Sequence, residues 1–315
     1  MSASPRPGPQ SDIVARLRAA GCVFAEDEAQ LLSSAARTPA ELAAMLDQRA
    51  AGLPLEQVVG WAEFCGLRIV VDAGVFVPRH RTEFLVRQAV ALARQAAAAD
   101  PGASGRPRAV IVDLCCGAGA VGAALDAALD GVELHAADID PAAVRCARRN
   151  VGAGGQVYEG DLYDPLPATL RGRVDILAAN VPYVPTGEIG LLPPEARLHE
   201  PRVALDGGGD GLDVMRRVAA AAPQWLAPGG SMLVETSERQ APQALEAIAR
   251  AGLIPQLASS DELHASVVIG TRPARPAAPR SAPEAGHDDR TGQLAQRLAG
   301  QRDLGTPDAA ADHHP

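Results

Sequence analysis

Two periods of apolar and polar residues follow each other along the chain. From residue 11 to about residue 51 the apolar residues recur at helical spacing, and Thr38-Pro39-Ala40-Glu41 has the form of a capping box with proline at the first helical position. Between residues 60 and 77 the alternation is typical of strands, with a turn at Asp72-Ala73-Gly74. We therefore predict a small helical unit and a β-hairpin ahead of the main domain.

The main domain alternates short apolar runs with amphipathic segments. Strands are predicted at residues 109–114, 132–138, 156–158, 174–179, 231–235, 254–258 and 265–269. Helices are predicted at residues 81–98, 120–129, 141–150, 211–226 and 239–251. Such alternation predicts an α/β fold with a doubly wound, mostly parallel, seven-stranded Rossmann-like sheet and right-handed crossovers.

These patterns divide the chain into five parts. We expect disorder at residues 1–10, a small helical domain for packing or docking at 11–60, a linking β-hairpin at 61–77, the main domain at 78–270, and a disordered tail at 271–315. The tail is rich in Pro, Ala, Arg and Asp, with one possible short helix near residues 293–298. A loop is expected at residues 101–105.

Composition narrows the classes of function. The chain has 315 residues, 47% of them hydrophobic, which is enough for one large core with a small satellite. Its formal net charge of −9 gives no basic face for non-specific binding of nucleic acid. All 29 basic residues are arginine, and the absence of lysine excludes a P-loop lysine, a Schiff-base lysine and a kinase-type lysine.

Cysteine and histidine add no sign of a disulfide framework or a metal site. The five cysteines form no C-x-x-C pair, and the seven histidines are scattered without ligand spacing. We expect reduced cysteines and no bound metal. No apolar run approaches the ~20 residues that span a bilayer, and the first ten residues lack the apolar core of a signal peptide. A cytoplasmic monomer without direct contact to nucleic acid is expected.

A glycine-rich turn follows the first strand of the main domain. Gly117, Gly119 and Gly122 satisfy G-x-G-x-x-G, for which a nicotinamide or flavin site is the default interpretation. Glycines let the backbone approach a ligand closely, and the following helix offers N–H donors. The pattern alone leaves the identity of the cofactor open.

Three acids at the ends of consecutive strands point away from a dinucleotide. Asp113 precedes the turn and can meet a cationic or amine-bearing group, while Asp138 ends the second strand, where an acid can hold both ribose hydroxyls. Asp161 follows the third strand and can accept from an adenine amino group. S-adenosylmethionine carries a sulfonium, an ammonium, a ribose diol and an adenine, and it has no phosphate. Three acids around a glycine turn suit this cofactor.

The fourth strand ends in Asn180-Val181-Pro182-Tyr183. This ending places an amide, backbone carbonyls and a flat ring at the carboxyl edge of the sheet, where open α/β sheets bind ligands. The side-chain oxygen of Asn180 and the carbonyl of Val181 can accept the two N–H groups of a planar carboxamide, and Tyr183 can pack against its face. Pro182 keeps the residue before it extended, so Val181 can offer its carbonyl.

Several short stretches together resemble one enzyme family. They are Pro54-Leu55-Glu56-Gln57-Val58-Val59-Gly60, Phe64-Cys65-Gly66-Leu67, Val77-Pro78-Arg79, Thr82-Glu83, the loop Asp113 to Gly119, Asp138-Ile139-Asp140-Pro141, Gly160-Asp161-Leu162-Tyr163, Asn180 to Pro185, Glu200 to Gly208, Asp210-Gly211-Leu212, Pro228-Gly229-Gly230 and Glu235. The Asn-x-Pro-Tyr strand end combined with the Glu-Pro-Arg…Asp-Gly-Gly block is the most specific part. The chain resembles the protein-glutamine amide methyltransferases that modify peptide-chain release factors, a branch of the class I S-adenosylmethionine-dependent methyltransferases.

The resemblance implies a fold, a reaction and a set of contacts. It makes residues 78–270 a class I methyltransferase catalytic domain and residues 11–60 a substrate-docking domain. The reaction is methyl transfer to the side-chain amide nitrogen of a glutamine in the Gly-Gly-Gln motif of a release factor. Cofactor contacts are implied at Cys115, Cys116, Gly117, Ala118, Gly119, Asp138, Leu162 and Asn180, and catalytic and substrate contacts at Asn180, Val181, Pro182 and Tyr183.

Three departures from the family pattern leave alternatives open. Val181 stands where the family has proline, Cys115-Cys116 stand where it has Gly-Thr or Gly-Ser, and the helical region before Pro54 is short. One alternative is methylation of an amino group on a nucleic-acid base, against which the acidic balance argues. The other is a degenerate, non-catalytic paralogue.

Overall fold

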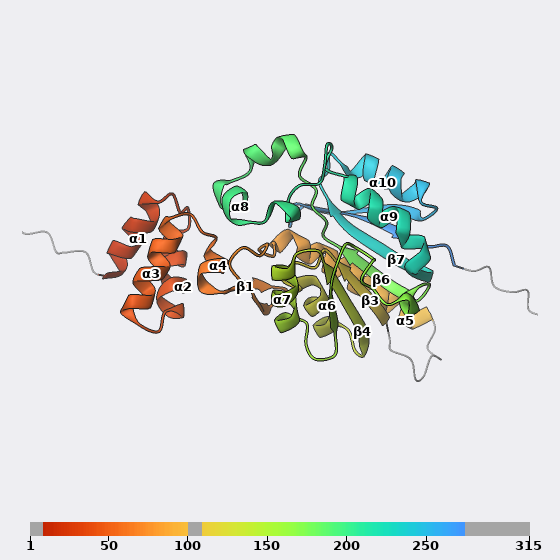
Figure 1. Cartoon of the computed structure of the whole chain (residues 1–315), viewed down its shortest axis with the longest axis horizontal. Coiled ribbons are helices and arrows are strands. Elements are labelled where there is room, and N and C mark those ends of the chain that lie inside the picture. The colour runs from red at the N-terminus through yellow and green to blue at the C-terminus, as the bar shows by residue number, and fades with distance from the viewer. Residues whose placement is uncertain (1–8, 100–108, 275–315) are drawn as a thin grey trace, which may run out of the picture. The chain divides into compact units, whose positions relative to one another are not determined.

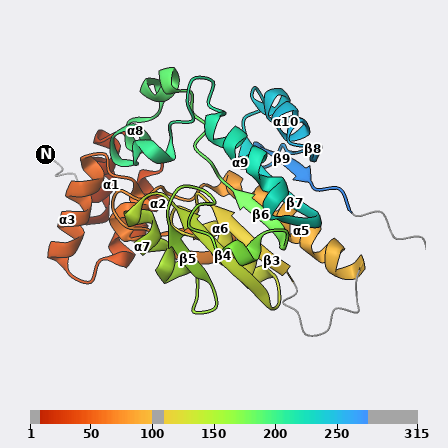
Figure 2. The ribbon, with the colours of Figure 1, turned by 45° about the vertical axis from the view of Figure 1, so that its right-hand side comes forward.

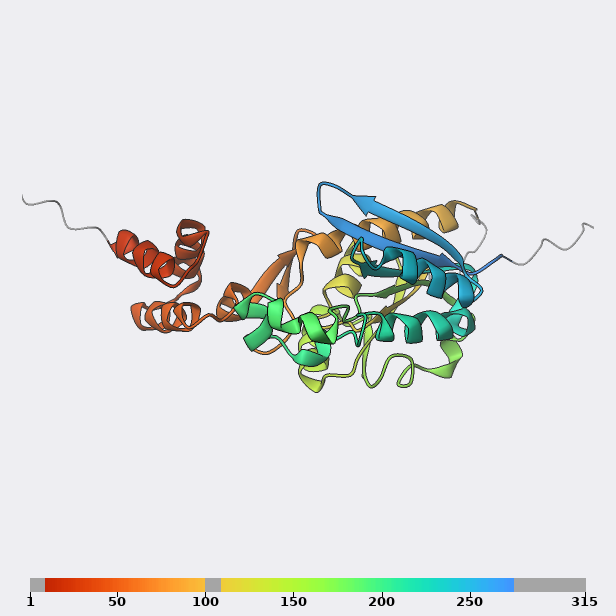
Figure 3. The same ribbon diagram turned by 90° about the horizontal axis from the view of Figure 1, so that it is seen from above.

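The computed structural model describes residues 9–99 and 109–274. The loop expected at residues 101–105 lies outside the described residues, as do residues 1–8 of the expected N-terminal disorder and almost all of the expected tail, including its short helix. Three helices, α1 (Pro9–Ala19), α2 (Ala25–Ala35) and α3 (Pro39–Ala50), pack side by side around Leu17 and Leu32 (Figure 3). The Oγ1 of Thr38 accepts from the backbone N–H of Glu41 at 3.1 Å, which is the cap that the sequence predicts.

The β-hairpin turns earlier than the sequence pattern indicates. After α4 (Leu55–Val59), β1 (Trp61–Phe64) pairs antiparallel with β2 (Leu67–Val70), so the hairpin turn is Cys65-Gly66. The predicted turn at Asp72-Ala73-Gly74 also forms, with Val75 N–H donating to the carbonyl of Asp72 at 3.1 Å, but it follows the hairpin. Both turn residues have positive φ, +51° for Cys65 and +74° for Gly66, as a tight two-residue hairpin requires. Cysteine is uncommon in that conformation, which is why the turn was not predicted.

A seven-stranded sheet forms the centre of the main domain (Figure 1). Its spatial order is β5-β4-β3-β6-β7-β9-β8; the first five strands in this order run parallel, and β9 runs antiparallel to both of its neighbours. The strands are β3 (Ala109–Leu114), β4 (Val132–Asp138), β5 (Gln156–Glu159), β6 (Val174–Ala179), β7 (Leu226–Thr236), β8 (Ile254–Ser260) and β9 (Ala265–Thr271). This topology confirms the predicted fold class.

Helices cover both faces of the sheet (Figure 2). They are α5 (Glu83–Ala99), α6 (Ala120–Ala128) and α7 (Pro141–Asn150) on one face, and α9 (Asp213–Trp225) and α10 (Ala241–Arg250) on the other. Alternate residues of β3 enter the two cores: Ile111 packs on the α5 side, and Val110 and Val112 pack on the α9 side. Within the described residues, no helix is long and apolar enough to span a membrane.

The strand order reverses between β3 and β6. The chain proceeds from β3 to β4 and β5 on one side, then returns to place β6 on the other side of β3. In doubly wound sheets, ligands bind at this switch point, outside the carboxyl ends of the strands. The segments that follow β6 contain η3 (Thr186–Leu191), α8 (Pro194–His199) and η4 (Arg202–Ala204), and η1 (His80–Thr82) precedes α5. They enclose the same edge.

Candidate active site

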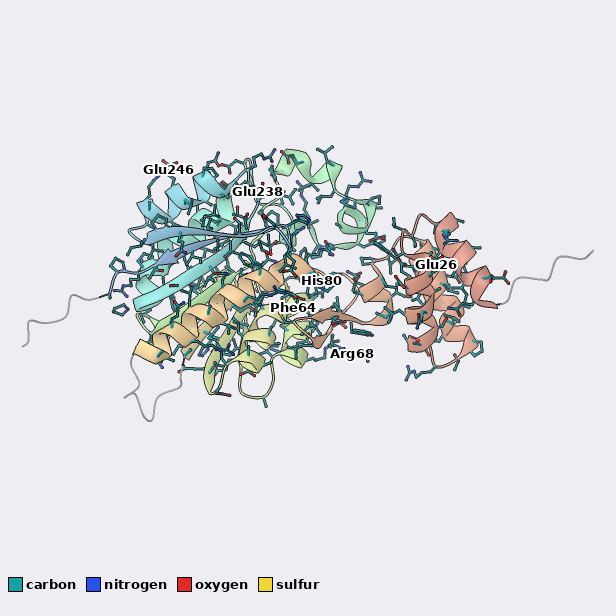
Figure 4. All side chains as sticks on the ribbon, turned by 180° about the vertical axis from the view of Figure 1, so that it is seen from behind. Glu26, Phe64, Arg68, His80, Glu238 and Glu246 are labelled. Atoms are coloured by element: carbon teal, nitrogen blue, oxygen red, sulfur yellow. The ribbon has the colours of Figure 1, made fainter. Side chains whose placement is uncertain are left out.

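A cavity of about 510 Å³ opens along the carboxyl edge of β3, β4 and β6. Every residue for which the sequence predicted a cofactor or substrate contact lines it except Gly119, and Gly122 of the glycine-rich turn does not line it either. We call the part formed by residues 113–118, 138–140 and 161–162 the cofactor end. The part formed by residues 78–82, 180–184 and 200–205 is the acceptor end. Phe64 and His80 lie near the start of α5 beside this region (Figure 4).

The turn after β3 is held open by its own backbone. Gly117 N–H donates to Oδ2 of Asp138 at 2.8 Å, and Gly119 N–H donates to the carbonyl of Cys116 at 2.7 Å. A Cβ on Gly117 would meet nothing within 4 Å, whereas one on Gly119 would lie 3.0 Å from Cγ2 of Val151. Gly117 therefore faces open space where a ligand can lie, and Gly119 is needed for the close packing of α6 on α7.

The carboxylate of Asp138 lies at the cofactor end and can accept more hydrogen bonds than the protein supplies. Its Oδ1 accepts from the N–H of Asp140 at 2.9 Å, and its Oδ2 accepts from Gly117. Burial raises the pKa of Asp138, while these backbone N–H groups act in the opposite direction. Each oxygen can accept a further hydrogen bond, as a ribose diol would need.

Asp113 is fully buried beneath the turn. Its Oδ2 accepts from the N–H of Gly122 at 2.8 Å, and a Cβ on Gly122 would lie 3.2 Å from that oxygen, which is a tight contact. Burial raises the pKa of Asp113 to about 7, with the charge of Asp138 adding to the effect. A cationic group in the cavity would stabilise the ionised form.

Asp161 and Leu162 close the cofactor end. Asp161 already pairs with Arg217 of α9 at 2.6 Å through Oδ2, so only part of its carboxylate is free for the adenine amino group proposed for it. Leu162 has a φ of +51° and Cys115 a φ of +54°, both uncommon for residues with a side chain. Backbone strain of this kind clusters at ligand sites.

The acceptor end is organised by a buried glutamate that the sequence interpretation gave no role. Glu235 of β7 is 3% exposed and accepts from Thr82 Oγ1 at 2.6 Å, from Arg81 Nε at 2.8 Å and from the Tyr183 hydroxyl at 3.2 Å. Thr82 in turn accepts from Nδ2 of Asn180 at 3.3 Å. Burial, with the charge of Glu235 adding to it, raises the pKa of Tyr183 to about 12, so its hydroxyl stays a donor.

Two further contacts fix the backbone of the acceptor loop. Val184 N–H donates to the carbonyl of Leu205 at 3.0 Å, and Gly207 N–H donates to the carbonyl of Val184 at 2.9 Å. A Cβ on Gly207 would lie 2.7 Å from the carbonyl oxygen of Pro182, so only glycine fits. Gln240, the N-cap residue of α10, donates to the carbonyl of Tyr183 at 2.9 Å. The Asp-Gly-Gly block therefore holds the Asn-x-Pro-Tyr loop in place.

Arg79 and Glu200 join the two walls of the acceptor end. One amino group of Arg79 donates to both carboxylate oxygens of Glu200, at 2.6 and 2.7 Å, and Val77 N–H donates to the same carboxylate at 3.1 Å. Burial raises the pKa of Glu200, and the Arg79 charge opposes that shift. The motifs around Arg79 and Glu200 are 121 residues apart in sequence, which explains why their partnership is invisible in the sequence.

The chemistry of the cofactor end fits S-adenosylmethionine. One end of the cavity is lined by three acids, Asp113, Asp138 and Asp161. The arginine at this end, Arg217, is paired with Asp161. Carboxylates suit hydroxyls, amino groups and positive charge, and they repel a pyrophosphate. Gly117 provides the open approach. The residues that would hold the cofactor are thus those acids, the turn backbone and Leu162.

Comparisons with known proteins find similar methyltransferases. A family model described as Methyltransferase small domain matches residues 102–210. A release factor glutamine methyltransferase of Geobacter sulfurreducens is 37% identical over 240 residues, covering 74% of this chain and 79% of that protein. A 4-amino-L-phenylalanine/4-methylamino-L-phenylalanine methyltransferase of Streptomyces pristinaespiralis is 36% identical over 192 residues, covering 59% and 62%. A solved release factor-specific protein-(glutamine-N5) methyltransferase of Alicyclobacillus acidocaldarius gives a TM-score of 0.37 at 21% identity, covering 62% of this chain and 94% of that chain.

Proposed function

The chain belongs to the release factor glutamine methyltransferase family, and from this premise we propose that it methylates the side-chain amide nitrogen of a glutamine in a protein substrate. The substrate that we propose is the Gly-Gly-Gln motif of a peptide-chain release factor. When bound, S-adenosylmethionine supplies an electrophilic methyl group on a positively charged sulfur. The observation that carries the proposal is the fixed amide of Asn180, whose Nδ2 is tied to Thr82 at the acceptor end.

The acceptor end has to make a weak nucleophile reactive. The lone pair of a carboxamide nitrogen is delocalised into its carbonyl, so the nitrogen must be held with its N–H groups turned away from the methyl donor. Oδ1 of Asn180 accepts one N–H and the carbonyl of Val181 accepts the other. Both hydrogen bonds strengthen as positive charge builds on nitrogen, which favours the transition state over the bound substrate. One of the two N–H protons is then released, which leaves a neutral N-methylamide. Correct placement of the reacting atoms lowers the activation barrier by several kcal/mol, and by about 7–11 kcal/mol in the best cases.

The rest of the loop provides shape and dryness. Pro182 is buried, Val181 packs into the core on the α9 side, and Tyr183 offers its ring face to the planar amide. Arg81 lies 5.8 Å from the centre of the Tyr183 ring and bonds its hydroxyl, so the ring is held from one side. Val181 thus occupies the position of the family's proline without exposing the loop to water.

The helical unit is the proposed docking surface for the protein substrate. Val23 and Phe24, between α1 and α2, are 82% and 69% exposed, although the unit has its own core. Arg49 of α3 pairs with Glu28 at 2.6 Å and also reaches Glu195 of α8 at 2.6 Å, and Glu195 lines the cavity. Through this contact, the segment that binds substrate is joined to the wall of the acceptor end.

A second candidate follows from the relative that methylates 4-amino-L-phenylalanine. It is 36% identical to this chain, and an amino group on a flat ring presents the same two N–H donors as a carboxamide. A free aromatic amino acid would need no docking surface. Reaction in the presence of the small amine alone would favour this candidate.

The test is methyl transfer from labelled S-adenosylmethionine to a recombinant release factor. The control is the same factor with the glutamine of its Gly-Gly-Gln motif replaced. We expect label in the first protein and none in the second. Equal labelling of both would refute the glutamine assignment, and label only in 4-amino-L-phenylalanine would support the second candidate. We further propose that the protein is a monomer and acts in the cytoplasm, where release factors act. Size-exclusion chromatography tests the oligomeric state.

A further inference from the structure

The single hydroxyl proton of Thr82 has only one place to go. Oγ1 lies 2.6 Å from Oε2 of Glu235, and an ionised carboxylate can only accept. Glu235 is kept in that role by two other donors, Nε of Arg81 at 2.8 Å and the hydroxyl of Tyr183 at 3.2 Å, both on Oε1. The proton of Thr82 is therefore committed to Glu235.

Asn180 then has no choice of orientation. Because the Thr82 hydroxyl donates its only hydrogen bond to Glu235, its oxygen can only accept a hydrogen bond from Asn180. The Asn180 atom that lies 3.3 Å from this oxygen is Nδ2. The flipped amide would place Oδ1 against an oxygen with no proton between them. Thr82 is 2% exposed and Glu235 is 3% exposed, so water does not readily replace either partner.

We propose that Thr82 and Glu235 are positioning residues that fix the amide of Asn180, so that Oδ1 and not Nδ2 is presented to the nitrogen that is methylated. This inference rests on the proposed function, in which Oδ1 accepts an N–H of the substrate amide. A flipped Asn180 would present a donor to a donor, and the nitrogen would lose the acceptor that orients it. Three successive hydrogen bonds, Arg81 to Glu235, Thr82 to Glu235 and Asn180 to Thr82, thus determine which end of the Asn180 amide faces the acceptor end.

Three substitutions separate direction from mere packing. Thr82→Ser keeps the hydroxyl and is expected to retain kcat within threefold. Thr82→Val keeps a similar volume but removes the acceptor, and kcat is expected to fall by about 10-fold or more while KM for the cofactor stays within threefold. Both are measured on a release factor with labelled S-adenosylmethionine.

Glu235→Gln is the reversal. Arg81 Nε is a donor, so it attracts the new amide oxygen and leaves the new NH2 group facing Thr82. Thr82 then accepts from residue 235 and donates its proton to Asn180, which turns Oδ1 toward Thr82. We expect kcat to fall at least as far as in Thr82→Val, again with cofactor KM nearly unchanged.

The orientation can also be seen without turnover. The chain has only two asparagines, Asn150 and Asn180, so protein labelled with 15N-asparagine shows two side-chain NH2 groups. Asn150 donates to the carbonyls of Val70 and Ala118, each at 2.8 Å, and serves as the reference for an intact fold. In the wild type and Thr82→Ser, an Asn180 amide proton should exchange slowly with solvent. In Thr82→Val and Glu235→Gln it should exchange at least 10-fold faster, with Asn150 unaffected.

The outcomes keep the two proposals apart. Equal protection of Asn180 in all four proteins, or wild-type kcat in Thr82→Val, would overturn the positioning role even if the release factor is the substrate. A wild type that does not label the release factor contradicts the proposed function, and the exchange experiment still decides the orientation of Asn180. Loss of the Asn150 reference in Glu235→Gln shows misfolding, and the decision then rests on the two Thr82 variants.

Discussion

The cofactor end is formed by residues that follow three consecutive strands, at 113–118, 138–140 and 161–162, whereas the acceptor end is formed by segments that lie far apart in sequence. Glu235 meets Thr82 across 153 residues, and Glu200 meets Arg79 across 121. At one end a short motif carries both the turn and its ligand groups. At the other end, the Asn-x-Pro-Tyr motif supplies the proposed reacting surface, and remote residues contact its side chains and determine their orientation.

Because the two ends are built differently, substitutions at each end should impair a different property of the enzyme. The cofactor contacts proposed at Asp138 and Gly117 use local backbone and one carboxylate, so damage there should appear in cofactor affinity. Contacts at Asn180 depend on β7, η1 and the Asp-Gly-Gly block, so damage there should appear in turnover.

The largest effect is expected for Asn180→Ala. Removing one preorganised hydrogen-bonding group from a reacting centre typically costs about 10²–10³ in kcat. Single-turnover methyl transfer to a release factor should fall by that factor at saturating cofactor. Turnover within fivefold of wild type would defeat the role given to Oδ1.

Asp113→Asn should change how stability depends on pH. The pKa of Asp113 is raised to about 7 from an ordinary value of 3.8, so the folded protein holds a proton that the unfolded chain has released. The free energy of unfolding therefore falls as pH rises toward 7, by about 3 kcal/mol between pH 5 and pH 8 for this group alone. The asparagine still accepts from Gly122 and lacks this slope.

Urea unfolding without cofactor at pH 5 and pH 8 measures the difference between the wild type and Asp113→Asn. The wild type should lose more stability than the variant over this interval. Parallel pH profiles would mean that Asp113 titrates near its ordinary pKa, and the account of its burial would be wrong.

Gly207→Ala should damage the acceptor end alone. The new Cβ would lie 2.6 Å from the carbonyl oxygen of Gly211 and 2.7 Å from that of Pro182, and such crowding typically costs about 1–3 kcal/mol. We expect kcat to fall about 10-fold and cofactor affinity to stay within threefold. Gly209→Ala is the matched control, because a Cβ there meets nothing within 4 Å. Equal kcat in the two variants would contradict the role of the Asp-Gly-Gly block in holding the Asn-x-Pro-Tyr loop in place.

The smallest effect is expected for Cys115→Gly at the cofactor end. A side chain at φ +54° costs about 1–2 kcal/mol, but glycine loses about 0.4–1 kcal/mol through the freedom of the unfolded chain. Stability should therefore change by less than about 1.5 kcal/mol, with cofactor affinity within threefold. Thermal unfolding with and without cofactor measures both. A large loss of affinity would show that the Cys115 side chain itself contacts the cofactor.

The sequence predicted the sheet well because its central strands are buried and its strands are bounded by turns. β3, β4 and β6 begin and end at the predicted residues, and the three strand-end acids meet in one cavity. The hairpin turn was misplaced because Cys65 adopts a conformation that its residue type rarely takes. The roles of Thr82 and Glu235 stayed hidden, since a long-range hydrogen bond leaves no periodic trace in the sequence, although both residues fall within stretches that match the family.

Calorimetric titration of S-adenosylmethionine tests the separation of the two ends most directly. In Asp138→Ala the dissociation constant should rise by about 10–100-fold, because hydrogen bonds to a charged group are lost. In Asn180→Ala it should stay within threefold of wild type. A comparable loss of affinity in both variants would contradict the account, because the acceptor end would then be part of the cofactor site.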